Sequence, residues 1–166
     1  MESGAIIDNG YSVYRVRYFT DGREARATFT VPYLAAAPPE GYAVAVNNPG
    51  TVGLADACAV GESLIGVGLA GYFGARGLFG VAVDYPGLAT DGDHPYLVLE
   101  LEGRAALDAT RAALNFARLE GIDVSGQAII AGLSQDGGHT DVAFSVLAQS
   151  QLRTEEAIQW MKSTLE

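Results

Sequence analysis

Apolar and polar residues alternate along the first part of the chain. One alternating stretch runs from Tyr14 to Tyr18, where tyrosine and valine alternate with arginine, and a second runs from Ala25 to Val31. An alternation with a period of two is typical of a strand that buries one face. The dipeptide Asp21-Gly22 between the two stretches favours a tight two-residue turn. The pattern therefore predicts an antiparallel β-hairpin over residues 11–31.

Beyond the hairpin, short apolar runs alternate with longer stretches of helical spacing. The predicted strands are Tyr42–Val46, Leu78–Val83 and Gln127–Ala131, and the predicted helices are Ser63–Ala75, Gly103–Leu119, Thr140–Ala148 and Thr154–Leu165. Apolar runs of this length are typical of fully buried strands. Strands that alternate with helices predict a parallel sheet with helices on both faces. We therefore expect an α/β fold with a mostly parallel sheet of about five strands and the antiparallel hairpin at its edge.

The length of 166 residues suits one domain. Within it we expect the hairpin at 11–31, a core over 42–151 and a C-terminal helix over 154–165. The helix expected at Ser63–Ala75 contains four glycines, which are Gly66, Gly68, Gly71 and Gly74. Because glycine lowers helix stability, this density indicates close packing of the helix on the sheet.

Charge and composition exclude some classes of partner. The formal net charge of −10 argues against nucleic acid or an anionic membrane surface. No apolar run reaches the ~18 residues needed to span a membrane. No signal peptide is expected at the N-terminus, so the compartment stays open. With one cysteine, Cys58, and two histidines, His94 and His139, we expect no disulfide within the chain, no metal site and no other cofactor.

The segment from Gly132 to His139 carries the most specific chemical signal. It begins Gly-Leu-Ser-Gln and lies between a predicted buried strand and a predicted helix. A Gly-x-Ser turn in this setting is typical of a nucleophile elbow, in which the serine stands clear of the sheet above a helix N-terminus. Two chemical interpretations are open, with either Ser134 or Asp136 as the nucleophile. A glycine-rich turn without chemistry is the third interpretation.

His94 and Asp84 are weaker candidates. Asp84 comes at the carboxyl end of a predicted strand, and His94 lies in the loop that follows it. Ligand-facing loops of parallel sheets sit at this edge, so His94 could approach Ser134 and Asp84 could orient the imidazole. A structural role for His94 is favoured over this pairing. His139, on the helix after Ser134, is also interpreted as structural.

Four segments carry a resemblance to a known family. They are Asn48–Cys58, Asp84–Leu97, Glu102–Asp108 and Gly132–His139, and together they span most of residues 10 to 148. In this order they resemble the α/β-hydrolase superfamily, and within it the secretory lipases and esterases of the lipase A type. The resemblance implies a truncated or minimal α/β-hydrolase that acts on small ester or lipid-like substrates. Proteins of this kind are often secreted.

The resemblance also implies roles for individual residues. Ser134 is then the nucleophile, and the backbone N–H groups of Gln135 and Thr51 stabilise the oxyanion. Two residues depart from the family's pattern, because Asp136 stands where the turn wants glycine and Pro49 stands where the family has histidine. The family's catalytic acid and histidine follow strands further downstream, so we expect an incomplete triad in this chain.

The family's strand order places the strand at 127–131 on an open edge of the sheet. This strand has no charge or proline to discourage pairing. We therefore expect a homo-oligomer, or a partner chain that pairs with this edge. The leading functional hypothesis is a serine ester hydrolase. The alternatives are a non-catalytic α/β-hydrolase-like binding or interaction module, and a hydrolase that uses Asp136.

Overall fold

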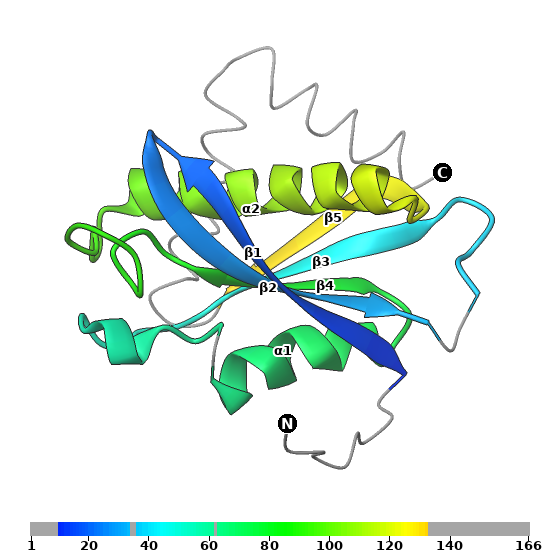
Figure 1. Ribbon diagram of the computed structural model, residues 1–166, viewed down its shortest axis with the longest axis horizontal. Helices are drawn as coiled ribbons and strands as arrows, with labels where there is room; N and C mark the ends of the chain where they lie inside the picture. The colour runs from blue at the N-terminus through cyan, green and yellow to red at the C-terminus, as the bar shows by residue number, and fades with distance from the viewer. Residues whose placement is uncertain (1–9, 34–35, 62, 133–166) are drawn as a thin grey trace.

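The computed structural model describes residues 10–33, 36–61 and 63–132, which form one twisted sheet with a helix on either side (Figure 1). The strands are β1 (Tyr11–Thr20), β2 (Arg23–Pro32), β3 (Tyr42–Asn48), β4 (Phe79–Asp84) and β5 (Val124–Gly132). The helices are α1 (Leu64–Gly74) and α2 (Leu99–Glu120), with a short 3-10 helix at Asp56–Cys58. Each strand predicted from the residue pattern is present.

The strands form one five-stranded sheet in the order β1-β2-β4-β3-β5. β2 is antiparallel to both of its neighbours, β1 and β4, whereas β3 is parallel to both β4 and β5. Only β2 therefore runs against the direction of the other strands. This arrangement confirms the α/β sheet with an antiparallel hairpin at one edge, and it places β5 at the other edge.

β5 is longer than its apolar run predicts. The pattern predicts Gln127–Ala131, and the strand covers Val124–Gly132. Gly126 has a φ of +78°, and the register against β3 shifts between Tyr42 and Val44. Because glycine adopts a positive φ without steric cost, a bulge at this point keeps the polar start of β5 in the sheet.

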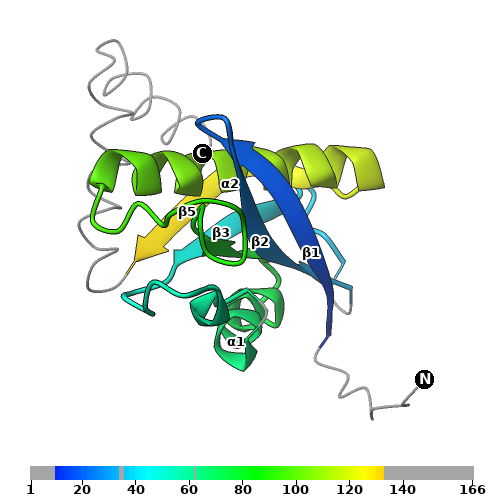
Figure 2. The ribbon, with the colours of Figure 1, turned by 60° about the vertical axis from the view of Figure 1, so that its left-hand side comes forward.

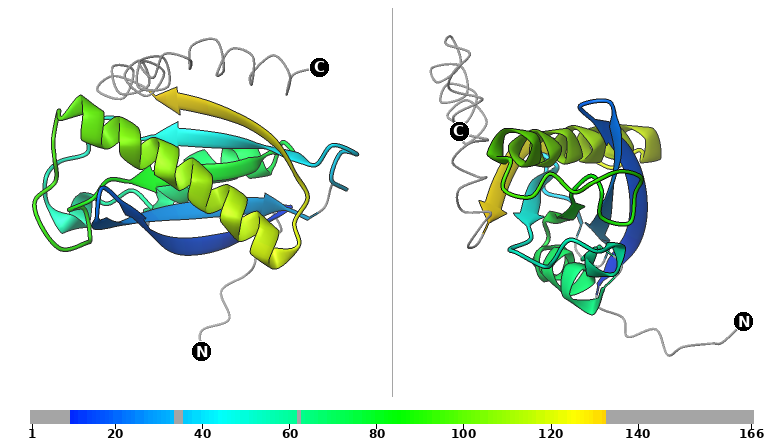
Figure 3. Two further views of the ribbon diagram at one scale, coloured as in Figure 1. Left: turned by 90° about the horizontal axis from the view of Figure 1, so that it is seen from above. Right: turned by 90° about the vertical axis from the view of Figure 1, so that its left-hand side faces the viewer.

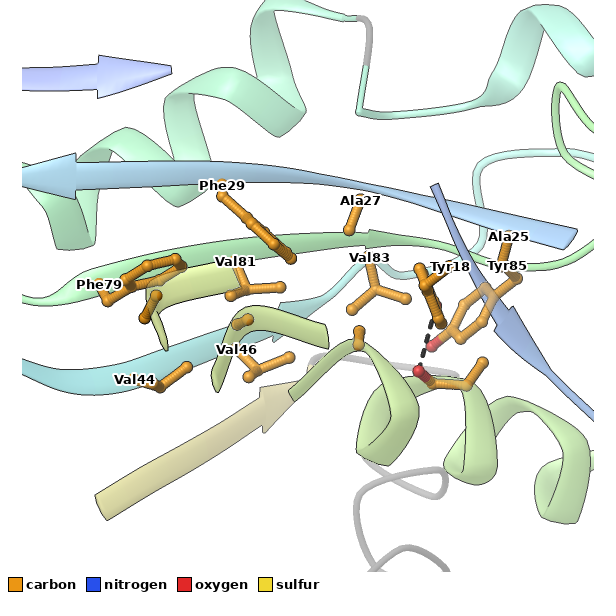
Figure 4. Close-up of a cluster of buried hydrophobic side chains, with 14 of the residues drawn as sticks. Tyr18, Ala25, Ala27, Phe29, Val44, Val46, Phe79, Val81, Val83 and Tyr85 are labelled. Carbon is orange, nitrogen blue, oxygen red and sulfur yellow. Dashed lines mark hydrogen bonds between the residues drawn. The ribbon is translucent and has the colours of Figure 1, made fainter. Parts of the chain in front are cut away.

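The main core lies between the sheet and α2 (Figure 4). Large side chains of β2, β3 and β4 fill it, and Phe29, Val46 and Val81 are completely buried. Four alanines of α2 have no exposed surface, namely Ala105, Ala109, Ala113 and Ala117. Residues four apart share one face of a helix. A face of alanines lets α2 lie close to the sheet.

The opposite face of the sheet carries α1 (Figures 2 and 3). The hydroxyl of Thr30 on β2 donates to the carbonyl oxygen of Ala70 at 2.7 Å. A Cβ on Gly80 of β4 would lie 2.2 Å from the same oxygen. The backbone of α1 therefore lies directly on the sheet, as the glycines of this helix predict.

Tyr18 links the hairpin to α2, and its pKa is raised in the fold. Its buried hydroxyl donates to the carbonyl oxygen of Ala105 at 3.1 Å, and Figure 4 shows this bond as a dashed line. Burial raises the pKa of Tyr18 well above its ordinary value, and the charges of Asp84 and Asp108 raise it further. A group whose pKa is higher in the folded state stabilises the fold below the unfolded pKa and loses that effect as the pH rises.

We therefore expect the free energy of unfolding of the wild type to fall as the pH rises above about 10, the ordinary pKa of tyrosine. The Tyr18→Phe variant cannot ionise, so its stability should fall less over the same range. At neutral pH the variant should lose about 1 kcal/mol with its hydrogen bond. Urea unfolding between pH 8 and 11 measures both effects, and equal alkaline slopes would contradict the assignment.

Candidate active site

β3 and β5 end side by side at one edge of the sheet. In the parallel register Asn48, the last residue of β3, lies opposite Gly132, the last residue of β5. Neighbouring strands are ~4.8 Å apart. The loop that carries Thr51 and the chain that continues toward Ser134 therefore leave the sheet from adjacent points.

Some of the predicted site residues and elements lie beyond Gly132. Outside the described residues are Ser134, Gln135, Asp136, His139 and the predicted helices Thr140–Ala148 and Thr154–Leu165. The described part of the site consists of the strand ends and of the loops that follow β3 and β4.

These two loops are held against each other. The carboxylate of Asp56 accepts the backbone N–H of Ala89 at 3.1 Å. The hydroxyl of Thr51 lies 3.4 Å from the hydroxyl of Tyr96. The loop after β4 thus supports the segment whose Thr51 N–H is the implied oxyanion donor.

His94 is buried between the loop after β4 and α2. Its Nε2 lies 3.5 Å from Oε1 of Glu102, and its Nδ1 lies 3.4 Å from the carbonyl oxygen of Pro86. The ring stacks on Tyr85 with centroids 5.6 Å apart. The side chain of His94 is only 4% exposed and that of Glu102 is fully buried. Because both ring nitrogens face protein oxygens, this geometry favours the structural role for His94.

Asp84 lies on the other side of the sheet. Its neighbour Val83 belongs to the core against α2, so alternation along β4 turns Asp84 toward α1. There its carboxylate accepts the backbone N–H of Gly61 at 2.8 Å. The carboxylate beside His94 is Glu102, which corrects the suggestion that Asp84 orients this imidazole.

Asn48 is a polar residue of the site that the residue pattern does not single out. It is 1% exposed, and neither Nδ2 nor Oδ1 has a hydrogen-bond partner within the described residues. An unsatisfied buried polar group costs about 1–3 kcal/mol, and such groups can mark functional sites. Asn48 stands at the strand end beside Gly132. The signal in the sequence was the pair Asn47-Asn48, which follows the apolar run Tyr42–Val46.

Metal-binding and membrane-spanning features are absent from the part of the chain that the structure describes. Its histidine, cysteine and acidic side chains form no group of three that could hold a metal ion. Cys58 is a free thiol. Neither of its long helices combines the length and apolar character that crossing a membrane requires.

Comparison with known proteins gives matches among solved structures. No family model and no curated protein matches the chain. A proposed hydrolase from Legionella pneumophila is 25% identical with a TM-score of 0.69, and the match covers 84% of this chain and 39% of that one. The ligand-bound rice cell wall degrading esterase LipA from Xanthomonas oryzae is 23% identical with a TM-score of 0.69, and the match covers 84% of this chain and 38% of that one. Candida antarctica lipase A in its closed state is 21% identical with a TM-score of 0.62, and the match covers 86% of this chain and 35% of that one.

The chain thus spans less than half the length of each of these proteins. Over that length the match takes in the mixed five-stranded sheet and its helices, as the four sequence segments predict. Over this part of their length, the chain shares the fold of these proteins.

Proposed function

We propose that the chain is a serine ester hydrolase in which Ser134 attacks the carbonyl carbon of an ester. The observation that carries this proposal is the pairing of Asn48 with Gly132 at the ends of β3 and β5. It brings the loop of Thr51 beside the strand end that leads to Ser134, and a nucleophile and its oxyanion donors require this proximity. The hydrolase, esterase and lipase among the fold neighbours support the same reaction class.

In the proposed reaction the Oγ of Ser134 bonds to the ester carbon, and negative charge develops on the carbonyl oxygen. The backbone N–H groups of Gln135 and Thr51 donate to that oxygen, and one such donor typically contributes about 100–1000-fold in turnover. The serine proton must pass to a base. Both nitrogens of His94 already face protein oxygens, so we assign the base and its acid partner to groups beyond the described residues.

Apolar residues around the strand ends support a small or lipid-like ester as the substrate. Val52 and Leu54 in the loop after β3 are 37% and 63% exposed, and Leu97 in the loop after β4 is 56% exposed. The contact between Thr51 and Tyr96 holds the two loops together. Exposed apolar side chains in the loops that follow these strand ends suit the acyl or alcohol part of such an ester.

A fluorophosphonate probe, which reacts with activated serines, tests the nucleophile. We expect the wild type to be labelled and the Ser134→Ala variant to lose both labelling and ester hydrolysis. Ser125→Ala is the matched control, because Ser125 lies on β5 away from the strand end, and it should be labelled like the wild type. A folded wild type without labelling or turnover would favour the non-catalytic binding module. Turnover without labelling that is lost in Asp136→Asn would assign the nucleophile to Asp136.

We also propose that the outer edge of β5 pairs with a second copy of this chain or with a separate partner chain. Among the described strands β5 has one neighbour, β3. Ile129 on β5 is 58% exposed, and an apolar strand edge without guarding charges readily pairs with another strand. Sedimentation at micromolar concentration should show a species larger than the 17.3 kDa monomer. A monomer with full esterase activity would contradict both this pairing and the incomplete triad.

A further inference from the structure

A cavity of about 270 Å³ opens on the sheet face that carries α1. The helix and the turn before it cover the neighbouring part of this face. There Thr28 donates to the carbonyl oxygen of Gly61 at 2.6 Å, and Thr30 donates to that of Ala70. Beyond Gly61 the sheet presents the side chains of Arg15, Arg17 and Arg26 to the cavity, together with Asp84.

The cavity concentrates positive charge in an acidic protein. Three of the ten basic residues of the chain line it, although the formal net charge of the chain is −10. The one acidic residue of the lining, Asp84, is 1% exposed and already accepts the N–H of Gly61. Three arginines against one aspartate leave two formal positive charges on the lining.

The strand register sets two of these arginines against each other. Arg17 on β1 lies directly opposite Arg26 on β2, and Arg26 lies opposite Asp84 on β4. Like charges that face each other across strands are destabilising. The carboxylate of Glu24 lies 3.7 Å from Arg17, whose side chain is 73% exposed. A surface pair of this kind contributes little.

Arg15 adds a cation without a partner of its own in the described chain. It lies opposite Thr28 in the register, is exposed, and forms no ion pair with a described residue. A guanidinium presents two parallel N–H donors that match the two oxygens of a carboxylate or a phosphate. An anion between Arg15 and Arg17 would receive such donors and relieve the repulsion between Arg17 and Arg26.

From this geometry we infer that the cavity is an anion-binding site for a small carboxylate or a phosphate monoester. The volume of about 270 Å³ exceeds that of a single inorganic anion and leaves room for the organic part of such a ligand. The inference is independent of the proposed esterase reaction, because it uses neither Ser134 nor the loop of Thr51.

Titration calorimetry of the full chain at low ionic strength tests the site, with inorganic phosphate and acetate as separate probes. We expect saturable binding of at least one of them. Arg15→Gln should weaken binding by about 10-fold or more, since it removes a charge-assisted bidentate contact. Arg76→Gln is the control, because Arg76 lies over the ring of Tyr72 outside this lining, and it should bind like the wild type.

The pattern of results decides the proposal and the ligand chemistry. Binding of phosphate alone assigns the site to phosphate monoesters, and binding of acetate alone assigns it to carboxylates. If Arg15→Gln melts at a lower temperature than the wild type, Arg17→Gln provides the second variant. Absence of binding at millimolar concentrations, or equal weakening by Arg76→Gln and the cavity variants, would overturn the inference. Neither result would affect the test of Ser134.

Discussion

Replacing His94 with alanine should destabilise the protein by about 3–5 kcal/mol, the usual effect of truncating a buried aromatic side chain. The substitution leaves the fully buried carboxylate of Glu102 without the imidazole at 3.5 Å. It also removes the ring that stacks on Tyr85 and contacts the carbonyl of Pro86. The loop after β4 would then lose its attachment to α2. Urea unfolding at neutral pH measures the loss.

Two further variants distinguish the effect of this buried pair from that of an exposed ion pair. Arg104 forms an ion pair with Glu100 at 2.7 Å on the same helix, but both side chains are largely exposed. Arg104→Ala should therefore have little effect despite the shorter distance, since solvent screens such pairs. Glu102→Gln keeps the shape of the side chain and a hydrogen-bonding group, so it should lower the free energy of unfolding less than His94→Ala does. If His94→Ala were as mild as Arg104→Ala, the buried pair would not hold the loop.

This pair also shows why the site was predicted only in part. The residue pattern predicts a helix from Gly103, which leaves Glu102 in the preceding loop. The helix begins at Leu99, and Glu102 joins its buried face three residues before Ala105. The negative charge of a first-turn glutamate favours a helix start, and that signal places Glu102 inside the helix.

Asp84 was misplaced for a different reason. β4 is buried at every position from Phe79 to Asp84, so its sequence shows no alternation of polar and apolar residues. Without alternation, no pattern tells which face a side chain takes. Only the packing of Val83 against α2, and of Gly80 against α1, fixes the direction of Asp84.

The hairpin and the strands were predictable because local patterns specify them. The alternation that predicts residues 11–31 appears in β1 and β2, and Asp21-Gly22 forms the turn between these strands. The order of the strands has no such local signal. The insertion of β4 between β2 and β3 depends on contacts between residues far apart in the chain, and it was not predicted from the sequence. The family resemblance supplied only the two edges of the sheet, the hairpin and β5.

The second large effect concerns α1, where Gly66→Ala should destabilise the protein by about 3 kcal/mol or more, at or above the upper end of overpacking effects. A Cβ on Gly66 would lie 2.0 Å from the carbonyl oxygen of Val60. That oxygen cannot easily withdraw, because it accepts the backbone N–H of Ser63 at 2.9 Å and the hydroxyl of Ser63 at 2.7 Å. The added methyl group must therefore break this turn or push the start of α1 away from it.

Gly68→Ala, two residues along the same helix, should change the stability in the opposite direction. A Cβ at Gly68 meets no atom within 4 Å, so the substitution only removes the entropic cost of glycine in a helix and should stabilise by about 0.5–1 kcal/mol. The two variants add the same methyl group to one helix, so helix propensity cancels and the difference in unfolding free energy reports the contact with Val60. Thermal and urea unfolding should both separate the variants. A stabilised Gly66→Ala would show that α1 does not lie against the Val60 turn, and that its glycines serve some purpose other than close packing.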